Sequence, residues 1–474
     1  MRSIFPSFYL LGVWLLFTVQ SSRAQEISIK LEKAYEAFIA SPALSNGMSS
    51  FTVRNSSTGE VIFEKHSQIG LPTASTLKVI TAITALDLLG EDFSFKTTLS
   101  HTGEIDSLGV LHGDLIVEGT GDPTLGSERY ANTKPEVILN RFKEGIIQLG
   151  IKEIQGRLIA DDHLYNGYVV PGTWMWTDIG NYYGAGLSSL NWKENKFGVR
   201  FTPQRAGQPA SISPVDETHF QLINEVQTGS IGSGDNVYGY TAPYSNVVYL
   251  RGTYGQDLKK TIEISSPDPA LDLALDLANV LRRDSIQIHD TVTTAKRLLN
   301  EKKNLPVKKR TIITTVESPD LGEIVHWFNQ KSINLYGEAL LKAIGGISAN
   351  TFKTQDAAEL VGKYWQGKLQ IAPSEIRTFD GSGLSPQNRV TTHAMSKIMY
   401  YAKKRPWFES FLKSLPQINK TKMKSGTIGG VLGYTGYQQS NDGQEYTFSL
   451  LVNNYQGSAS QMRQHMFRLL DSLK

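Results

Sequence analysis

The chain has 474 residues, of which 40% are hydrophobic and 20% charged, and it contains no cysteine. This composition is that of a globular protein with about two or three domains, and it excludes disulfide bonds and thiolate chemistry. Lysine and arginine (48) exceed aspartate and glutamate (45) by only three, so the charge does not indicate nucleic-acid binding.

The first 24 residues are typical of a secretory signal peptide. Arg2 precedes the apolar run IFPSFYLLGVWLLFTV, and Ser22 and Ala24 fit the small-residue pattern of a cleavage site. We therefore expect export to the periplasm with cleavage after Ala24. The alternative is a retained N-terminal anchor. No later stretch of the sequence is long and apolar enough to span a bilayer.

The mature chain is predicted to begin with a helix followed by a pair of strands. Residues 27–41 have the apolar spacing of an amphipathic helix. Residues 49–55 and 60–66 alternate between apolar and polar types and are joined by the turn-forming sequence SSTG. This pattern predicts a strand–turn–strand unit.

The run LPTASTLKVITAITALDLLG (71–90) predicts a helix from Ser75 to Leu89 with a broad apolar stripe. Lys78 lies one turn after Ser75, so both side chains point the same way. The pair has two interpretations. It is either a nucleophile with its base, or an N-cap serine beside a solvated lysine.

From residue 97 to 310 the sequence consists of short alternating runs separated by Gly, Asp and Pro, which predicts a β-rich region. Two short helices are expected in it, near 135–150 and 270–283. Residues 97–310 are therefore predicted to form an inserted region with two subdomains.

Helical patterns return after this region. A helix is expected with Ser318 as its N-cap, and a second helix is expected to start near Asn334 and to be stopped by Gly345 and Gly346.

The end of the chain predicts two strands around an Asn-Asp-Gly turn, and then a helix over 458–474 with four apolar residues on one face. The expected architecture is an α/β domain formed by residues 25–96 and 311–474. Its N- and C-terminal parts complete one sheet, which the β-rich region interrupts in sequence.

Two further short motifs are candidates for parts of an acyl-transfer site. The sequence KSINLYGEA places Ser332 and Asn334 between two helices, where side chains can project into a cleft. The sequence MKSGTIGG places Lys424 just ahead of a predicted strand. Each motif is weak alone, but the order S-x-x-K, S-x-N, K-S-G is far more specific.

These motifs, together with GDLIVEGTGDPTL (113–125) and FDGSGLSPQNRVTT (379–392), resemble those of the class C low-molecular-mass penicillin-binding proteins. That family consists of exported D-alanyl-D-alanine carboxypeptidases and endopeptidases with a serine penicillin-binding/β-lactamase-like domain of helices around an antiparallel sheet. The resemblance covers essentially the whole mature chain. Threonine is common in the family where this chain has Ser425, which keeps the hydroxyl.

The resemblance implies roles for the motif residues. Ser75 would attack the D-Ala–D-Ala carbonyl and form an acyl-enzyme, and Lys78 would take its proton. Ser332 would relay a proton to the leaving amine, while Asn334 would hold Lys78 and the substrate amide. Lys424 would face the terminal carboxylate.

Residues 425–427 complete the implied site. Ser425 would bind the carboxylate with Lys424, Gly426 would let the extended substrate lie against the strand, and the N–H groups of Thr427 and Ser75 would form the oxyanion hole. The implied enzyme uses no metal and no cofactor. Its partners would be peptidoglycan stem peptides and β-lactams, the latter as covalent inhibitors.

The aromatic segment VPGTWMWTDIGNYYGAGLSSLNW has two interpretations. Its rings are either ordinary core, or Trp176, Asp178 and Tyr183 contact the side chain of the stem peptide's third residue, as the resemblance implies. Two alternative functions also stay open. One is a β-lactamase-like hydrolase, and the other is a catalytically idle cell-wall binding protein.

Overall fold

The computed structural model describes residues 25–165, 169–215, 218–305 and 309–474. The predicted signal peptide, residues 1–24, lies outside the described residues. Within those ranges no helix has both the length and the apolar character needed to cross a bilayer. The chain divides into two compact units: Met1–Ile83, Val361–Thr378 and Pro386–Lys474 in the first, and Thr84–Leu360 and Phe379–Ser385 in the second.

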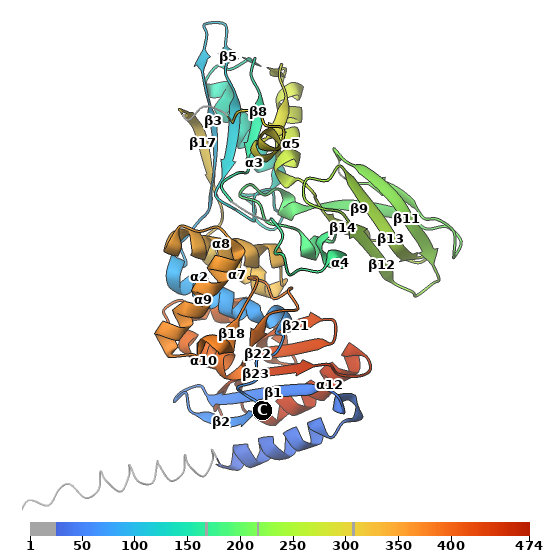
Figure 1. Ribbon diagram of the computed structural model, residues 1–474, viewed down its shortest axis with the longest axis vertical. Helices are drawn as coiled ribbons and strands as arrows, with labels where there is room; N and C mark the ends of the chain where they lie inside the picture. The colour runs from blue at the N-terminus through green and yellow to red at the C-terminus, as the bar shows by residue number, and fades with distance from the viewer. Residues whose placement is uncertain (1–24, 166–168, 216–217, 306–308) are drawn as a thin grey trace, which may run out of the picture. The chain divides into compact units, whose positions relative to one another are not determined.

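The first unit is built on a six-stranded antiparallel sheet to which both parts of the chain contribute (Figure 1). Strand β1 pairs with β2 on one side and with β23 on the other, so that Thr52 lies opposite Ser449. Across the sheet the strands are β2 (Val61–Lys65), β1 (Met48–Asn55), β23 (Glu445–Asn453), β22 (Val431–Gln439), β21 (Thr421–Ile428) and β20 (Gln417–Ile418). The expected initial strand pair, the final hairpin and the shared sheet are confirmed.

Helices cover both faces of this sheet. Residues 25–39 are helical and share a hydrophobic cluster with α12 (Ala459–Leu470), in which Phe51 is buried. On the other face, the Ser50 hydroxyl lies 2.7 Å from that of Thr392 at the start of α10. Successive strand residues therefore point to different helices. The unit also contains α10 (Thr392–Ala402), α11 (Phe408–Ser414), β18 (Ile376–Arg377), β19 (Arg389–Val390), η1 (Pro42–Leu44), η2 (Ala74–Leu77), η5 (Pro373–Glu375) and η6 (Asp471–Leu473).

One part of the second unit consists of two sheets packed around a single hydrophobic core. Helices α3 (Pro135–Gln148) and α5 (Pro269–Arg283) contribute Phe142 and Leu277 to this core and lie beside the larger sheet (Figure 1). The larger sheet has the order β16 (Val292–Thr294), β8 (Leu158–Asp161), β6 (Leu115–Gly119), β3 (Lys96–His101), β17 (Thr311–Glu317). The smaller has the order β15 (Gln287–Ile288), β7 (Glu153–Ile154), β5 (Val110–His112), β4 (Glu104–Ile105).

Another part of the second unit has its own hydrophobic core, to which Phe197 and Leu250 belong. Its two sheets have the orders β10 (Ser211–Pro214), β9 (Lys196–Thr202), β14 (Thr261–Ser265) and β11 (Gln221–Gly229), β13 (Val247–Gly255), β12 (Asp235–Tyr240). Residues 97–310 as a whole are β-rich, as expected. The two helices predicted in them are present, but the prediction missed α4 (Trp176–Ile179), α6 (Ala295–Asn300), η3 (Tyr182–Gly184) and η4 (Lys193–Asn195).

Two predicted helix boundaries are wrong. Helix α7 (Leu321–Gln330) has Asp320 as its N-cap, because the Ser318 hydroxyl instead accepts from the Phe95 N–H at 2.9 Å. Helix α8 (Asn334–Ala349) continues through both predicted stop glycines and ends at Asn350, which is left-handed. A Cβ on Gly345 would lie 2.6 Å from the Thr351 carbonyl oxygen, so this glycine permits a close chain approach. Helices α2 (Lys78–Leu89) and α9 (Thr354–Leu369) each contain one of the boundaries between the units.

Candidate active site

Ser75 lies in the 3-10 turn η2, and the α-helix begins only at Lys78. The expected helix from Ser75 is therefore corrected at its first turn. Ala74, just before Ser75, has a φ of 45°, which is uncommon for a residue with a side chain. The Thr76 hydroxyl donates to the Thr73 carbonyl at 2.7 Å and fixes the turn. Residues three apart eclipse each other in a 3-10 turn, so Ser75 and Lys78 still share one side.

The Lys78 ammonium nitrogen lies 2.9 Å from Ser75 Oγ, within hydrogen-bond distance. The Lys78 side chain is completely buried, whereas Ser75 is only partly so. A buried amine in contact with a reachable hydroxyl is the arrangement of a nucleophile and its base. Ser75 lies inside η2, whose N-cap is Thr73, and Lys78 is buried, so the interpretation as an N-cap serine beside a solvated lysine is wrong.

Lys424 lies on β21 in the first unit. Like Lys78, it is a buried lysine of the candidate site. Its ammonium donates to the Ser425 carbonyl oxygen at 2.9 Å, and its side chain is 1% exposed. Burial lowers the pKa of Lys424 to about 7, because water no longer solvates the charge. An incoming carboxylate would favour the charged form and raise this pKa.

Gly426 brings β21 against the turn that carries Ser75. A Cβ on Gly426 would lie 2.7 Å from the Thr73 carbonyl oxygen and 2.9 Å from the Ser75 nitrogen. Gly433 is its cross-strand partner on β22, and a Cβ there would lie 3.0 Å from the Thr76 methyl group. Two opposed glycines therefore allow the Ser75 backbone to approach the sheet closely.

Thr427 follows on the same strand and is exposed. Its hydroxyl oxygen accepts from an Arg463 N–H at 3.3 Å, so α12 supplies a cation beside the K-S-G motif. Sequence reasoning missed Arg463. The surrounding sequence QMRQHM is that of an ordinary amphipathic helix, and only the fold brings it to β21.

The S-x-N residues belong to the second unit and lie where α7 ends and α8 begins. Ser332 has a φ of 57°, in the left-handed region, and Asn334 is the first residue of α8. The Asn334 side-chain amide donates to the Tyr183 carbonyl oxygen at 2.7 Å. The motif asparagine is thus joined to the aromatic segment, a contact that the sequence did not predict.

The three candidate contacts of the aromatic segment lie on α4 and η3. Trp176 is 56% exposed, so the interpretation as ordinary core is wrong for this ring, whereas Trp174 and Trp192 of the same segment are buried in the core. Tyr183 is partly buried. The Tyr183 hydroxyl lies 3.5 Å from Asp178 Oδ1. Partial burial raises the pKa of both Asp178 and Tyr183.

A buried carboxyl group holds the backbone of the DGSG stretch (380–383). The Gly381 and Ser382 N–H groups donate to Glu338 Oε1 at 3.1 and 3.0 Å. Asp380 accepts from the Trp174 indole N–H at 2.9 Å. Burial, followed by the nearby Asp380, raises the pKa of Glu338 to about 8. Sequence reasoning assigned no role to Glu338, which lies one helical turn after Asn334.

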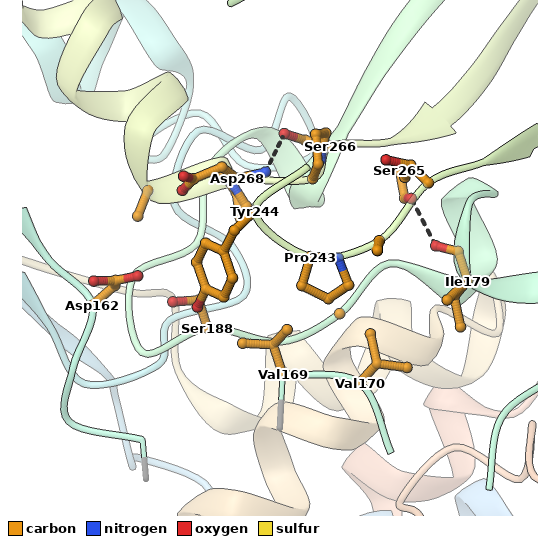
Figure 2. A pocket seen from close by; sticks show the side chains of 16 residues that line it. Asp162, Val169, Val170, Ile179, Ser188, Pro243, Tyr244, Ser265, Ser266 and Asp268 are labelled. Atoms are coloured by element: carbon orange, nitrogen blue, oxygen red, sulfur yellow. Dashed lines mark hydrogen bonds between the residues drawn. The ribbon is translucent and has the colours of Figure 1, made fainter. Parts of the chain in front are cut away.

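A separate cavity of the second unit is shown in Figure 2. It is lined by Asp162, Tyr244 and Asp268 together with other polar and apolar residues, and none of the predicted site residues belongs to its lining. The cavity is therefore distinct from the groups that the motifs define.

The chain belongs to the D-Ala-D-Ala carboxypeptidase 3 (S13) family, whose model matches residues 31–473. It is thus a serine-type D-Ala-D-Ala carboxypeptidase by family. The resemblance and the enzyme class expected from the sequence are confirmed.

Individual relatives agree with this placement. The chain is 25% identical over 461 residues to a D-alanyl-D-alanine carboxypeptidase of an Actinomadura species, with 91% of this chain and 82% of the relative covered. It is 23% identical to D-alanyl-D-alanine carboxypeptidase DacB of Haemophilus influenzae, with 85% of each covered. Its fold is similar to the crystal structure of penicillin binding protein 4 (dacB) from the same organism, with a TM-score of 0.76, 20% identity, and 90% and 95% of the two chains covered. The expected fold class is confirmed.

Proposed function

We propose that this enzyme cleaves the terminal D-alanyl bond of peptidoglycan stem peptides through an acyl-enzyme on Ser75. The observation that carries this proposal is the 2.9 Å distance between the Ser75 hydroxyl and the fully buried amine of Lys78. Lys78 takes the serine proton as Ser75 attacks the carbonyl. Water then hydrolyses the ester and regenerates the serine.

Lys424 and Ser425 bind the terminal carboxylate of the substrate. Lys424 has little exposed surface, so an approaching carboxylate meets a poorly hydrated cation and its attraction is strong. The N–H groups of Ser75 and Thr427 stabilise the oxyanion. Gly426 supports this arrangement because it allows β21 to lie against the Ser75 backbone.

Ser332 and Asn334 serve the leaving group and the substrate backbone. Ser332 relays the proton to the departing D-alanine amine, and Asn334 orients the peptide amide. The bond from Asn334 to the Tyr183 carbonyl supports a link between this motif and the aromatic segment. Asp178, Tyr183 and Trp176 then contact the third-residue side chain of the stem peptide.

The same proposal includes export and antibiotic binding. Residues 1–24 act as a signal peptide that directs the enzyme to the periplasm. The catalytic part comprises residues 25–96 and 311–474, and residues 97–310 are an insertion that acts on substrate choice. β-Lactams acylate Ser75 because they enter as carbonyl substrates. The resulting acyl-enzyme is hydrolysed slowly.

The experiment is incubation of the purified mature enzyme with uncross-linked and cross-linked muropeptides, followed by mass analysis of the products. Loss of one D-alanine from pentapeptides identifies carboxypeptidase activity, and conversion of dimers to monomers identifies endopeptidase activity. Ser75→Ala is the matched control. Rapid β-lactam hydrolysis without either peptide reaction would favour the β-lactamase-like alternative, and binding without any turnover would favour the idle binding protein.

A further inference from the structure

The outer face of the sheet β11–β13–β12 carries aromatic rings in register, of which Tyr238 and Tyr249 are exposed and Tyr240 is partly exposed. Along β13, Val248 and Leu250 are buried while Tyr249 and Arg251 between and after them are exposed. Tyr240 on β12 lies opposite Tyr249, and Tyr238 lies opposite Arg251. Residues directly opposite on one face touch each other, so these four side chains form one surface. We call it the aromatic face.

Contacts with neighbouring side chains order the rings of Tyr240 and Tyr249 before any ligand arrives. The Arg251 guanidinium lies 5.7 Å from the Tyr240 ring centroid and 5.3 Å from that of Tyr249. Glu225 on β11 binds Arg251 at 2.5 Å and fixes the guanidinium. The Trp176 ring, one of the proposed third-residue contacts, lies next to this face, with its centroid 6.4 Å from that of Tyr240. Ordered aromatic groups lose little conformational entropy when a ligand binds.

The aromatic face is continuous with the segment proposed to bind the stem peptide. The Gly239 N–H on β12 donates to Asn181 Oδ1 at 3.1 Å, just after α4. A Cβ on Gly180 would lie 2.1 Å from the Gly239 carbonyl oxygen, so the two backbones are in direct contact. Tyr183 in turn accepts from Asn334. A chain of short contacts therefore runs within this unit from the S-x-N motif to the sheet.

The chemistry of this face fits a neutral sugar polymer better than an anionic one. Its cation, Arg251, is already paired with Glu225, so the pair presents no net charge to a nucleic acid or an acidic lipid surface. Flat exposed rings stack on the C–H faces of pyranose rings. The exposed side chains in the next row, Asn236 and Gln227, can bond hydroxyl and acetamido groups.

We propose that the aromatic face binds the glycan strand of peptidoglycan, a polymer of N-acetylated hexosamines, while the attached stem peptide enters the catalytic site. This inference rests on the proposed function, because it takes the same substrate. Two peptide residues separate the third residue from the sugar, a reach of about 7 Å when extended. A glycan site next to the third-residue contacts therefore matches the covalent structure of the substrate.

The test is cosedimentation of the enzyme with chitin, an insoluble and neutral polymer of N-acetylated hexosamine that carries no peptide. Wild-type enzyme binds, and Tyr249→Ala and Tyr240→Ala each reduce the association constant about fivefold or more. Tyr249→Phe keeps the ring and restores binding. Ile231→Ala is the matched control, because Ile231 is 75% exposed in the turn between β11 and β12 and has no ring. Thermal unfolding verifies that each variant is folded.

The outcomes separate this inference from the proposed function. Absence of wild-type binding to the glycan, or equal binding by the alanine variants, overturns the inference even if stem peptides are cleaved. Self-association that the alanine variants abolish, without glycan binding, assigns the face to a second copy of this chain and also overturns it. Absence of peptide cleavage by wild-type enzyme overturns the proposed function alone, because glycan binding is measured without turnover.

Discussion

The two groups of candidate residues differ in how the protein holds them. In the first unit, Lys78 and Lys424 are buried, and opposed glycines bring the sheet against the turn of Ser75. In the second unit, Trp176 is exposed and Tyr183 is held through its backbone carbonyl. Proton transfer requires a fixed distance and a desolvated amine, whereas peptide recognition needs accessible side chains. Substitutions in the first group should therefore stop acylation by every substrate. Substitutions in the second group should lower the turnover of only some substrates.

The largest expected effect is that of Lys78→Arg. A guanidinium keeps its proton and cannot serve as the base, so acylation by penicillin should fall by about a thousandfold or more at every pH from 5 to 10. The measurement is the acylation rate constant with a fluorescent penicillin. Because arginine is larger than the buried lysine, Lys78→Met provides a second variant that also lacks a base. Substantial activity in either folded variant would assign the base to another group.

Gly426→Ala tests the close approach of β21 to the nucleophile. The added methyl would meet backbone atoms of Thr73, Ser75 and Thr76 at 2.7 to 2.9 Å, so the turn must shift. We expect a destabilisation of about 1–3 kcal/mol and a clear loss of acylation rate. Calorimetry and penicillin labelling measure the two effects.

Gly429→Ala is the matched control, because a Cβ there meets no atom within 4 Å. If Gly426→Ala labelled at the wild-type rate, the glycine would not be needed to position Ser75.

Asp178→Ala should have a smaller and selective effect. Penicillin lacks the third-residue side chain, so its acylation rate should change little while stem-peptide turnover falls about tenfold. Tyr183→Phe removes the hydroxyl near Asp178 but keeps the backbone carbonyl that Asn334 contacts. Parallel losses with penicillin and peptide would show that Asp178 supports the structure instead.

The smallest expected effect is that of Glu338→Gln on the pH dependence of stability. The pKa of Glu338 is raised to about 8 in the folded protein, so its contribution to stability is complete at low pH and is lost as the pH rises through 8. Glutamine cannot ionise but keeps an acceptor for Gly381 and Ser382. Between pH 6 and 9 the Tm of the wild type should therefore fall relative to that of the variant, by a few degrees. Parallel Tm curves would mean that Glu338 is ionised throughout.

Local sequence patterns predicted many of the helices and strands and the pairing of Ser75 with Lys78, because these features depend on short spacings. The penicillin-binding fold class was implied by the family resemblance. Ser75 and Lys78 are three residues apart, and the hairpin of β22 and β23 follows from its turn. The features that the sequence did not predict depend on contacts between residues far apart in the chain. Ser318 is not the N-cap because its hydroxyl accepts a hydrogen bond from the backbone N–H of Phe95, more than 200 residues earlier. Arg463 reaches Thr427 only through the packing of α12.

The most direct test of the account is the site of the covalent adduct. The mature enzyme and its Ser75→Ala variant are treated with benzylpenicillin, digested, and mapped by mass spectrometry. We expect one adduct in the wild type on the peptide that contains Ser75, and none in the variant, whose Tm should be nearly unchanged because Ser75 lies inside the 3-10 turn and is not its N-cap. An adduct that persists in the variant, or that maps to another residue in the wild type, would contradict Ser75 as the nucleophile.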